Sequence, residues 1–481
     1  MLERMIALGA IAALAGCMTV GPDYKRPSID TPKQWPVASV SEPVSSHWWK
    51  SYGDPVLDEM VEEALVHNLD LRLAIARVSE ARAQLGAARA DRYPGVSAAA
   101  AASRNRASED SALGAPPGSD PTFSDYTASL NVSYEIDFWG KYRRATEAAR
   151  AELLSARHNR DAVRIALIGE VVKGYFNLRA LDAQVEVTRR TISTRLASTA
   201  LQRLRFQSGV ASEFDLRQVE AQAAQAQALL PRLEQQVAVQ ENALSVLLGR
   251  SPRAIVEQPM DRGAAIDVLA MPPSVPAGLP SDLLERRPDL QQAEQSLVAA
   301  NARIGQARAA YYPSISLTGL FGGESESLGN LFKSSARVWL FSAAAAQTVF
   351  DAGRTASRVE AAQAREQQAL ARYQSAIQNA FRETLDALVA QRKAREALEA
   401  QQARVTALQS ALKLAQLRYD NGVSSLLEVL DAERGLLDAQ LNRIDAQRVR
   451  LAATTDLFKA LGGGWDPARP DQTASAPGRA N

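Results

Sequence analysis

Residues that could support catalysis or bind a metal ion are few in this chain and lie far apart. The three histidines are His47, His67 and His158, and the single cysteine is Cys17. No His-x-x-x-His, Cys-x-x-Cys or Gly-x-Ser-x-Gly motif occurs, and no Gly-x-x-x-x-Gly-Lys-Ser/Thr loop for phosphate. Acidic pairs such as Asp58-Glu59 fall on predicted amphipathic helices, where solvated side chains are the usual finding. The sequence therefore predicts a protein that is not an enzyme and has no metal and no cofactor.

Cys17 is better explained as a site of covalent lipid attachment. Residues 1–16 are short, mostly apolar and rich in small side chains, and they end in Leu14-Ala15-Gly16 directly before Cys17. Such a segment is shorter than the roughly 20 apolar residues of a spanning helix and is typical of a signal peptide. The Leu-Ala-Gly-Cys sequence resembles a bacterial lipobox, and Met18 after the cysteine resembles a sorting signal for the outer membrane. An ordinary signal peptide with an incidental cysteine is the alternative.

The chain carries a long internal repeat. Residues 68–98 and 287–317 share a pattern at a constant offset of 219, and Tyr93-Pro94 matches Tyr312-Pro313. Further on, Leu248-Gly249 matches Leu461-Gly462 at an offset of 213. A repeat of this length exceeds the 20–50 residues of a solenoid unit. We therefore expect one fold built from two homologous halves.

Each half is predicted to contain a very long helix followed by a second, antiparallel helix. Residues 141–207 contain no proline, and residues 354–420 contain neither glycine nor proline. At 1.5 Å per residue each stretch is about 100 Å long, and its apolar residues recur at steps of three and four. Glycine turns follow both, which favours helix ends there. The second helices are predicted at 213–248 and 424–461.

In the segments before the long helices, apolar and polar residues alternate with a period of two. This pattern predicts the β-hairpins 93–139 and 312–352. Apolar and polar residues alternate through 127–138. Leu130 and Val132 are among the apolar residues, and Asn131 is among the polar ones. Twelve alternating residues suit a tilted transmembrane strand of about 9–11 residues. The region 338–346 alternates poorly. A soluble, half-buried sheet is the alternative.

A membrane-spanning version of this sheet requires more than one chain. Four strands are too few to close a barrel, because the smallest membrane barrels have about eight. Open strand edges in lipid would leave backbone groups unpaired at several kcal/mol each. A dimer with eight strands and a trimer with twelve both satisfy this requirement.

Several motifs together resemble the outer-membrane efflux factors of the TolC/NodT type, in their lipoprotein branch. The motifs that carry the resemblance are Cys17-Met18-Thr19-Val20-Gly21-Pro22-Asp23-Tyr24, Arg287-Pro288-Asp289-Leu290, the stretch 300–316, Leu430-Asp431-Ala432-Glu433-Arg434 and Leu461-Gly462-Gly463-Gly464-Trp465. They cover nearly the whole mature chain in the family's order.

The resemblance implies a mainly α-helical protein with membrane β-strands, assembled as a homotrimer. Its fold would be a 12-stranded outer-membrane β-barrel continued by a 12-helix periplasmic α-barrel, with two structural repeats per chain. The implied function is a passive exit duct of a Gram-negative bacterium, joined by a periplasmic adaptor (membrane fusion) protein to an inner-membrane pump of the resistance-nodulation-division type. The implied division is a signal peptide 1–16, a lipidated segment 17–67, repeat 1 at 68–249, an equatorial linker 250–286, repeat 2 at 287–462 and a tail 463–481.

The resemblance also implies a periplasmic aperture at the turn after the second long helix. By position, Arg418 and Tyr419 would be constriction and linking residues, Leu427 would form an apolar ring, and Glu428 and Asp431 would form acidic rings. Ser424 departs from the arginine that some members use as a gate link. The alternative is that both acids simply occupy a helix start, where the helix dipole favours negative charge.

Other functions remain open at this point. An adhesion or structural coiled-coil lipoprotein would need neither hairpins nor an aperture, and a type I secretion duct for polypeptides would share the fold. The net charge is +1 without a basic patch, so no nucleic-acid partner is expected. Only Met18, Met60, Met260 and Met271 remain after processing, and they form no thioether cluster that would favour copper or silver.

Overall fold

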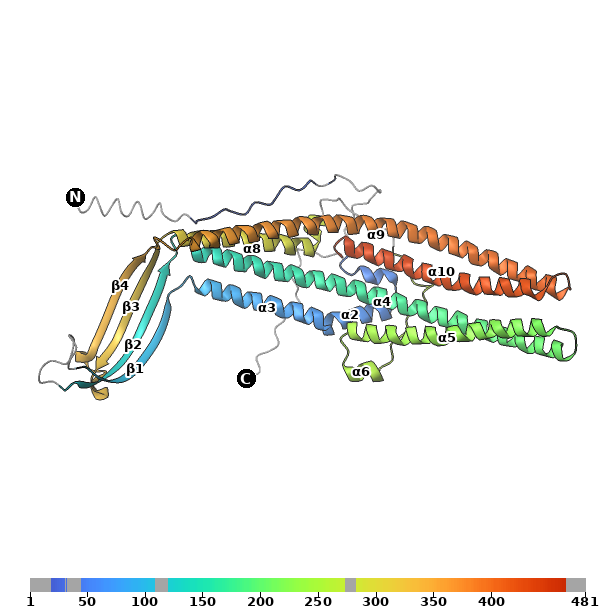
Figure 1. The fold of residues 1–481 in the computed structure, drawn as a ribbon, viewed down its shortest axis with the longest axis horizontal. Helices are drawn as coiled ribbons and strands as arrows, with labels where there is room; N and C mark the ends of the chain where they lie inside the picture. The colour runs from blue at the N-terminus through green and yellow to red at the C-terminus, as the bar shows by residue number, and fades with distance from the viewer. Residues whose placement is uncertain (1–18, 31, 33–44, 109–119, 273–282, 464–481) are drawn as a thin grey trace. The chain divides into compact units, whose positions relative to one another are not determined.

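A computed structural model describes residues 19–30, 32, 45–108, 120–272 and 283–463 of the chain (Figure 1). These residues fall into two compact units. The first unit holds the described parts of 1–28, 78–156 and 293–373, and the second holds those of 29–77, 157–292 and 374–481. Both long helices contribute to both units. Within the described residues the fold is mainly helical, with a single sheet.

The sheet belongs to the first unit and has four antiparallel strands in sequence order (Figure 1). The strands are β1 (Gly95–Arg106), β2 (Thr122–Ile136), β3 (Ser314–Ser325) and β4 (Arg337–Ala346). The short 3-10 helices η4 (Leu328–Asn330) and η5 (Ser334–Ala336) connect β3 to β4. Because β1 and β4 each have one neighbour, both are edge strands.

Strand β2 differs from the predicted segment 127–138 at both ends. It starts earlier because Thr122 to Tyr126 pair with Arg106 to Ala102 of β1. It stops at Ile136 because the Asp137 carboxylate accepts hydrogen bonds from the backbone N–H groups of Tyr142 (3.1 Å) and Arg143 (2.8 Å), at the start of the next helix. The irregular stretch 338–346 lies in β4, which pairs with β3 through the register Ser314↔Ala346 to Gly323↔Arg337.

The long helices are α4 (Lys141–Gln207) and α9 (Arg354–Asp420), each of 67 residues. Figure 1 shows α5 (Glu213–Leu247) returning along α4 and α10 (Leu426–Ala460) returning along α9. Proline 231 lies inside α5. The shorter helices α3 (Leu69–Ala90) and α8 (Pro288–Arg308) precede the strands, and the one-turn η3 (Ala309–Tyr311) follows α8.

The largest apolar core among the described residues lies in the second unit and contains aromatic side chains of η1, α4 and α10. In η1 (Trp48–Tyr52), Trp48 stacks on Phe458 of α10 with ring centroids 4.8 Å apart. Tyr52 packs edge-on against Phe176 of α4. Helix α2 (Pro55–His67) contributes Leu57 and Val61 to the same core. Two small helices, α6 (Pro252–Glu257) and α7 (Leu283–Arg286), lie in the region predicted as the equatorial linker.

The segment that follows Cys17 is fixed to helices of the first unit. Glu294 on α8 is buried and accepts hydrogen bonds from the Tyr24 hydroxyl and from two nitrogens of Arg26, at 2.7 and 2.6 Å. Arg144 on α4 donates to Asp23 at 2.7 Å. Two charged contacts thus hold residues 23–26 against different helices. Cys17 itself lies outside the described residues.

Candidate functional site

The turn that joins α9 to α10 positions all five residues predicted for the aperture. Gly422 adopts a left-handed φ of 73°. The backbone N–H of Val423 donates to the Arg418 carbonyl and that of Gly422 to the Tyr419 carbonyl, both at 2.9 Å. This pair of bonds is a Schellman motif, which ends α9 and reverses the chain. Residues 418 and 419 therefore lie in the last turn of α9, opposite the first turns of α10.

Both predicted acids have an arginine partner within the same chain. The Arg418 Nε atom lies 3.6 Å from Glu428 Oε2, which joins the end of α9 to the start of α10. Asp431 pairs with Arg434, three residues later on α10. All four side chains are at least half exposed, so these ion pairs contribute little to stability. Their main consequence is electrostatic, because the positive charge of an arginine compensates each acid.

Tyr419 has a contact that the sequence did not predict. The Arg205 Nη1 atom of α4 donates a hydrogen bond to the Tyr419 hydroxyl at 3.2 Å. The Arg205 guanidinium also lies 5.8 Å from the centroid of the tyrosine ring, within the range of a cation–π interaction. This single contact joins the ends of the two long helices. Arg205 occupies the position in repeat 1 that matches Arg418.

Leu427 is 60% exposed beside a groove between α5 and α10. The groove has a volume of about 320 Å³, and Leu427, Leu430, Asp431 and Arg434 line it from α10. An exposed leucine between charged neighbours leaves apolar surface uncovered in a single chain. The role of Leu427 in an apolar ring stays a prediction, as do the roles assigned to the other four aperture residues.

Buried Arg195 and partly buried Glu433, behind the turn, were also missed. Arg195 of α4 is 3% exposed, and its Nη1 atom donates to the Gln222 carbonyl at 2.7 Å. Its Nε and Nη2 atoms have no partner among the described residues. Arg195 and Glu433 of α10 both line a cavity of about 220 Å³. Burial raises the pKa of Glu433 and the Arg195 charge opposes that rise, whereas burial lowers the pKa of Arg195. No local signal pairs two residues so far apart in sequence.

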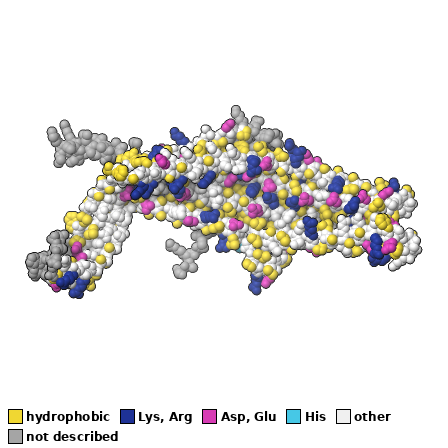
Figure 2. Space-filling view, in the orientation of Figure 1, with side chains coloured by type: hydrophobic (Ala, Val, Ile, Leu, Met, Phe, Trp, Pro, Cys, Tyr) yellow, Lys and Arg dark blue, Asp and Glu magenta, His cyan; other side chains and the backbone are white. Residues whose placement is uncertain are grey.

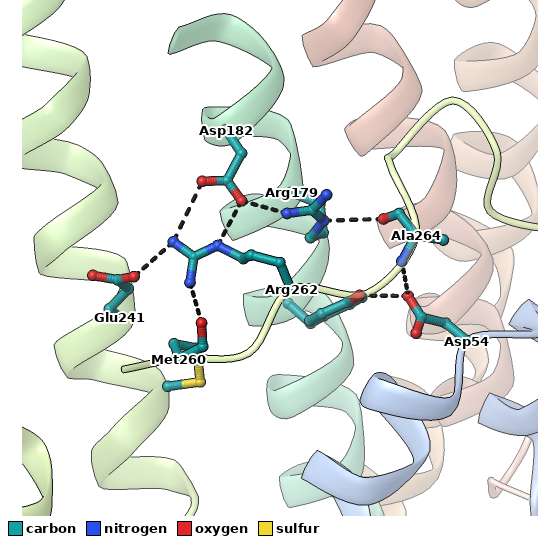
Figure 3. Close-up of polar contacts among 8 residues, drawn as sticks. Asp54, Arg179, Asp182, Glu241, Met260, Arg262 and Ala264 are labelled. Carbon is teal, nitrogen blue, oxygen red and sulfur yellow. Dashed lines mark hydrogen bonds and ion pairs between the residues drawn. The ribbon is translucent and has the colours of Figure 1, made fainter. Parts of the chain in front are cut away.

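A polar network fixes the segment 258–272 against the helices of the second unit (Figure 3). Arg262 donates to Asp182 of α4 at 2.9 Å and to Glu241 of α5 at 2.6 Å. Buried Asp54, which precedes α2, accepts hydrogen bonds from the Ala264 backbone N–H at 2.9 Å and from the Tyr175 hydroxyl. These contacts join the segment 258–272 to α4, α5 and the start of α2.

The two faces of the sheet differ as the alternation predicted. Directly paired residues share a face in an antiparallel sheet. Leu130 pairs with Phe321, and Phe321 pairs with Trp339, so these three side chains lie on one face. Their exposed fractions are 52%, 57% and 75%. Asn131 lies on the opposite face, which also carries Leu320. The first face therefore presents a broad apolar surface that the described residues leave exposed.

Among the described residues, no helix is both long enough and apolar enough to cross a bilayer. No group of three or more histidine, cysteine or acidic side chains in that part of the chain has a geometry that could hold a metal ion. The candidate site thus consists of the charged turn at the end of the long helices and the apolar face of the sheet.

Known proteins resemble this chain over nearly its whole length. The model of the outer membrane efflux protein family matches residues 60–250 and 279–463. The toluene efflux pump outer membrane protein TtgC of Pseudomonas putida is 37% identical over 474 residues, covering 97% of this chain and 96% of the relative. The probable outer membrane lipoprotein SilC of Salmonella typhimurium is 34% identical over 468 residues, with 96% and 99% coverage.

Among solved structures, the outer membrane channel CmeC of Campylobacter jejuni superposes with a TM-score of 0.89. It is 26% identical, and the match covers 94% of this chain and 96% of that channel. The family model spans both halves of the chain, and the relatives align over almost their full length. The chain belongs to the outer membrane efflux protein family.

Proposed function

We propose that the chain is the passive exit duct of a tripartite efflux system in the outer membrane of a Gram-negative bacterium. The observation that carries the proposal is the combination, in one member of this family, of an exposed apolar sheet face with two helices of 67 residues. The apolar face of the sheet suits the lipid phase. The two long helices suit the wall of a conduit, because each helix is about 100 Å long. Energy would come from an inner-membrane pump, joined to the duct through a periplasmic adaptor.

The edges of the sheet support a trimer as the working assembly. In the part of the chain that the structure describes, strands β1 and β4 each lack one neighbour, and unpaired backbone groups in lipid cost several kcal/mol each. Pairing β4 of one copy with β1 of the next removes every edge. Three copies then give a closed barrel of 12 strands and a ring of 12 helices, which is the arrangement implied by the family resemblance.

Small toxic compounds are the proposed cargo. The relative TtgC is named for toluene efflux, and SilC is named as an outer membrane lipoprotein. We assign drugs and similar small molecules to the duct on the basis of TtgC. We assign a covalent lipid on Cys17 on the basis of SilC and of the Leu14-Ala15-Gly16-Cys17 boundary.

We also propose that the α9–α10 turn forms the narrow periplasmic entrance. Glu428 and Asp431 would form acidic rings around the threefold axis, each balanced by Arg418 or Arg434. Tyr419 would hold the resting constriction through its contact with Arg205. Replacing both acids leaves two arginines unpaired in each chain, so the charge of these four residues changes from balanced to positive.

The double variant Glu428→Ala/Asp431→Ala is therefore expected to shift the selectivity of the channel toward anions, because fixed charges in a narrow pore select the opposite ion. Reversal potentials across planar bilayers with a salt gradient measure this selectivity. In the same recordings, Tyr419→Phe is expected to raise the conductance, since the hydroxyl that binds Arg205 is removed.

Repeat 1 offers a charge-matched control for this experiment. Glu213 and Glu220 lie at the start of α5 and both pair with Arg217. The variant Glu213→Ala/Glu220→Ala removes the same charge from the neighbouring turn, and its effect on selectivity is expected to be smaller. Unaltered selectivity in the Glu428→Ala/Asp431→Ala channel would refute the acidic-ring assignment. An absence of conducting channels in the unaltered protein would refute the duct itself.

Cys17→Ala is expected to abolish lipidation completely, because acylation requires the thiol and the chain has no other cysteine. Metabolic labelling with palmitate followed by immunoprecipitation measures this directly. The variant should still form channels, since Glu294 and Arg144 hold residues 23–26 independently of the lipid. Equal palmitate incorporation in the variant would show that Cys17 is not the lipidation site.

A further inference from the structure

Charged residues within the four strands are divided between the two faces of the sheet. Side chains alternate along a strand, so residues an even number of positions apart share a face. Arg104 and Arg106 of β1 are even steps from Ala98, which pairs with Leu130 on the apolar face. Arg337 of β4 precedes Trp339 by two residues, on the same face. All basic residues of the described strands therefore lie on the apolar face.

The acidic residues of the strands lie on the opposite face. Asp125 and Glu135 are even steps from Asn131, and Glu324 pairs with Thr127, also on the Asn131 face. Asp125 and Glu324 share the loop end of the sheet with the three arginines. Figure 2 shows the basic side chains gathered at this end. At the loop end of the sheet, the apolar face is thus positive and the polar face is negative.

A cavity of about 570 Å³ opens on the positive, apolar face. Its walls include Ala98, Leu130 and Phe321 from the strands, and Phe332 and Lys333 from the β3–β4 connection, with Arg337 beside them. Alanine and glycine residues line much of it, and Gly323 lies so close to the β3–β4 connection that an added Cβ would collide with the carbonyl oxygen of Leu331. Phe332 is 88% exposed. Apolar walls and two cations therefore border the same hollow.

This combination fits a lipid that carries a phosphate, because an acyl chain needs apolar walls and its headgroup needs cations at one end. Among the described residues, Lys333 and Arg337 have no ion pair within the chain. A second copy of the chain would bring the same positive face, and like charges would repel. The loop end is the end of the strands away from the helices, so it corresponds to the outer leaflet if the helices are periplasmic.

We propose that this face binds a phosphorylated glycolipid of the outer leaflet, with an acyl chain in the cavity and a phosphate at Lys333 and Arg337. The proposal rests on the placement of the strands in the outer membrane under the proposed function. Binding would fix the depth of the sheet in the bilayer and order the β3–β4 connection at the mouth of the duct.

The test uses the purified full-length protein in detergent, with fluorescent lipid A as the probe. The variant Lys333→Gln/Arg337→Gln is expected to bind lipid A about thirtyfold more weakly, which corresponds to two lost cation–phosphate contacts. Dephosphorylated lipid A should bind the unaltered protein with a similarly reduced affinity. Ala98→Leu narrows the cavity without changing charge, and it should weaken the binding of both lipids.

The control Asp125→Asn/Glu324→Gln removes charges from the same end of the opposite face, and it is expected to leave lipid affinity unchanged. Comparable migration of all variants on unboiled gels establishes that they are assembled. Equal affinity for the two lipids, or unchanged binding by Lys333→Gln/Arg337→Gln, would overturn the proposal. Competition by inorganic phosphate as strong as that by lipid A would reduce the site to a simple anion site and overturn it as well. If the unaltered protein still forms a conducting channel, each of these results would leave the proposed duct function intact.

Discussion

Arginine at position 130 or 132 is expected to prevent assembly of the chain in the outer membrane. Leu130 and Val132 lie on the face that also carries Phe321 and Trp339, and all four side chains are exposed among the described residues. An arginine on a lipid face near mid-membrane costs about 2–4 kcal/mol, and a trimer contains three copies. The assembled fraction is measured by membrane fractionation and by migration on unboiled gels.

Asn131→Arg is the matched control, because it introduces the same residue one position away on the opposite face. Asn131 donates to Ser129 on that face at 3.2 Å, among partly polar neighbours. We expect this variant to assemble far better than Leu130→Arg or Val132→Arg. Equal assembly of all three would show that this strand does not face lipid, and the soluble-sheet alternative would then be preferred.

Asp54→Ala is expected to destabilise the second unit by roughly 3–5 kcal/mol. The carboxylate is 1% exposed and accepts from Val56 N at 3.0 Å, from Ala264 N at 2.9 Å and from the Tyr175 hydroxyl. Loss of the helix N-cap costs about 1 kcal/mol, and each buried donor left unpaired costs about 1–3 kcal/mol. Urea unfolding followed by the fluorescence of buried Trp48 and Trp49 reports on this core.

Asp58→Ala provides the comparison within the same helix. The Asp58 Oδ1 atom is buried without a hydrogen-bond partner among the described residues, and burial raises the pKa of this carboxyl. Its removal should therefore change the free energy of unfolding by less than about 1 kcal/mol. A similar loss for Asp54→Ala and Asp58→Ala would contradict the role of Asp54 as the junction of α2, α4 and the segment 258–272.

The features that sequence reasoning predicted well depend on local signals. Helix α9 ends where Asn421-Gly422 supplies a left-handed turn, and its interior lacks glycine and proline. The faces of β2 follow from strict alternation between Leu130 and its neighbours. Both signals lie within a few residues of the structure that they determine, so one sequence is sufficient to recognise them.

The contacts that sequence reasoning missed join residues far apart in the chain. Arg205 meets Tyr419, and Arg195 faces Glu433 across a cavity. Such pairs depend on how two helices are rotated against each other, and composition and periodicity do not fix that rotation for an individual side chain. The same reason explains why the arginine partner of Glu428 was not foreseen. Trimer formation and the aperture roles stay predictions, because a single chain does not contain the interfaces on which they depend.

The central claim is that this chain is the exit duct of a tripartite efflux system. Its most direct test is the accumulation of ethidium in a host without other outer-membrane efflux proteins. Cells that lack the chain, cells that lack its inner-membrane pump and cells that lack both should accumulate the dye to the same raised level, because duct and pump act in series. Normal dye export in cells without the chain, or a higher level in the double deletion than in either single deletion, would contradict the account.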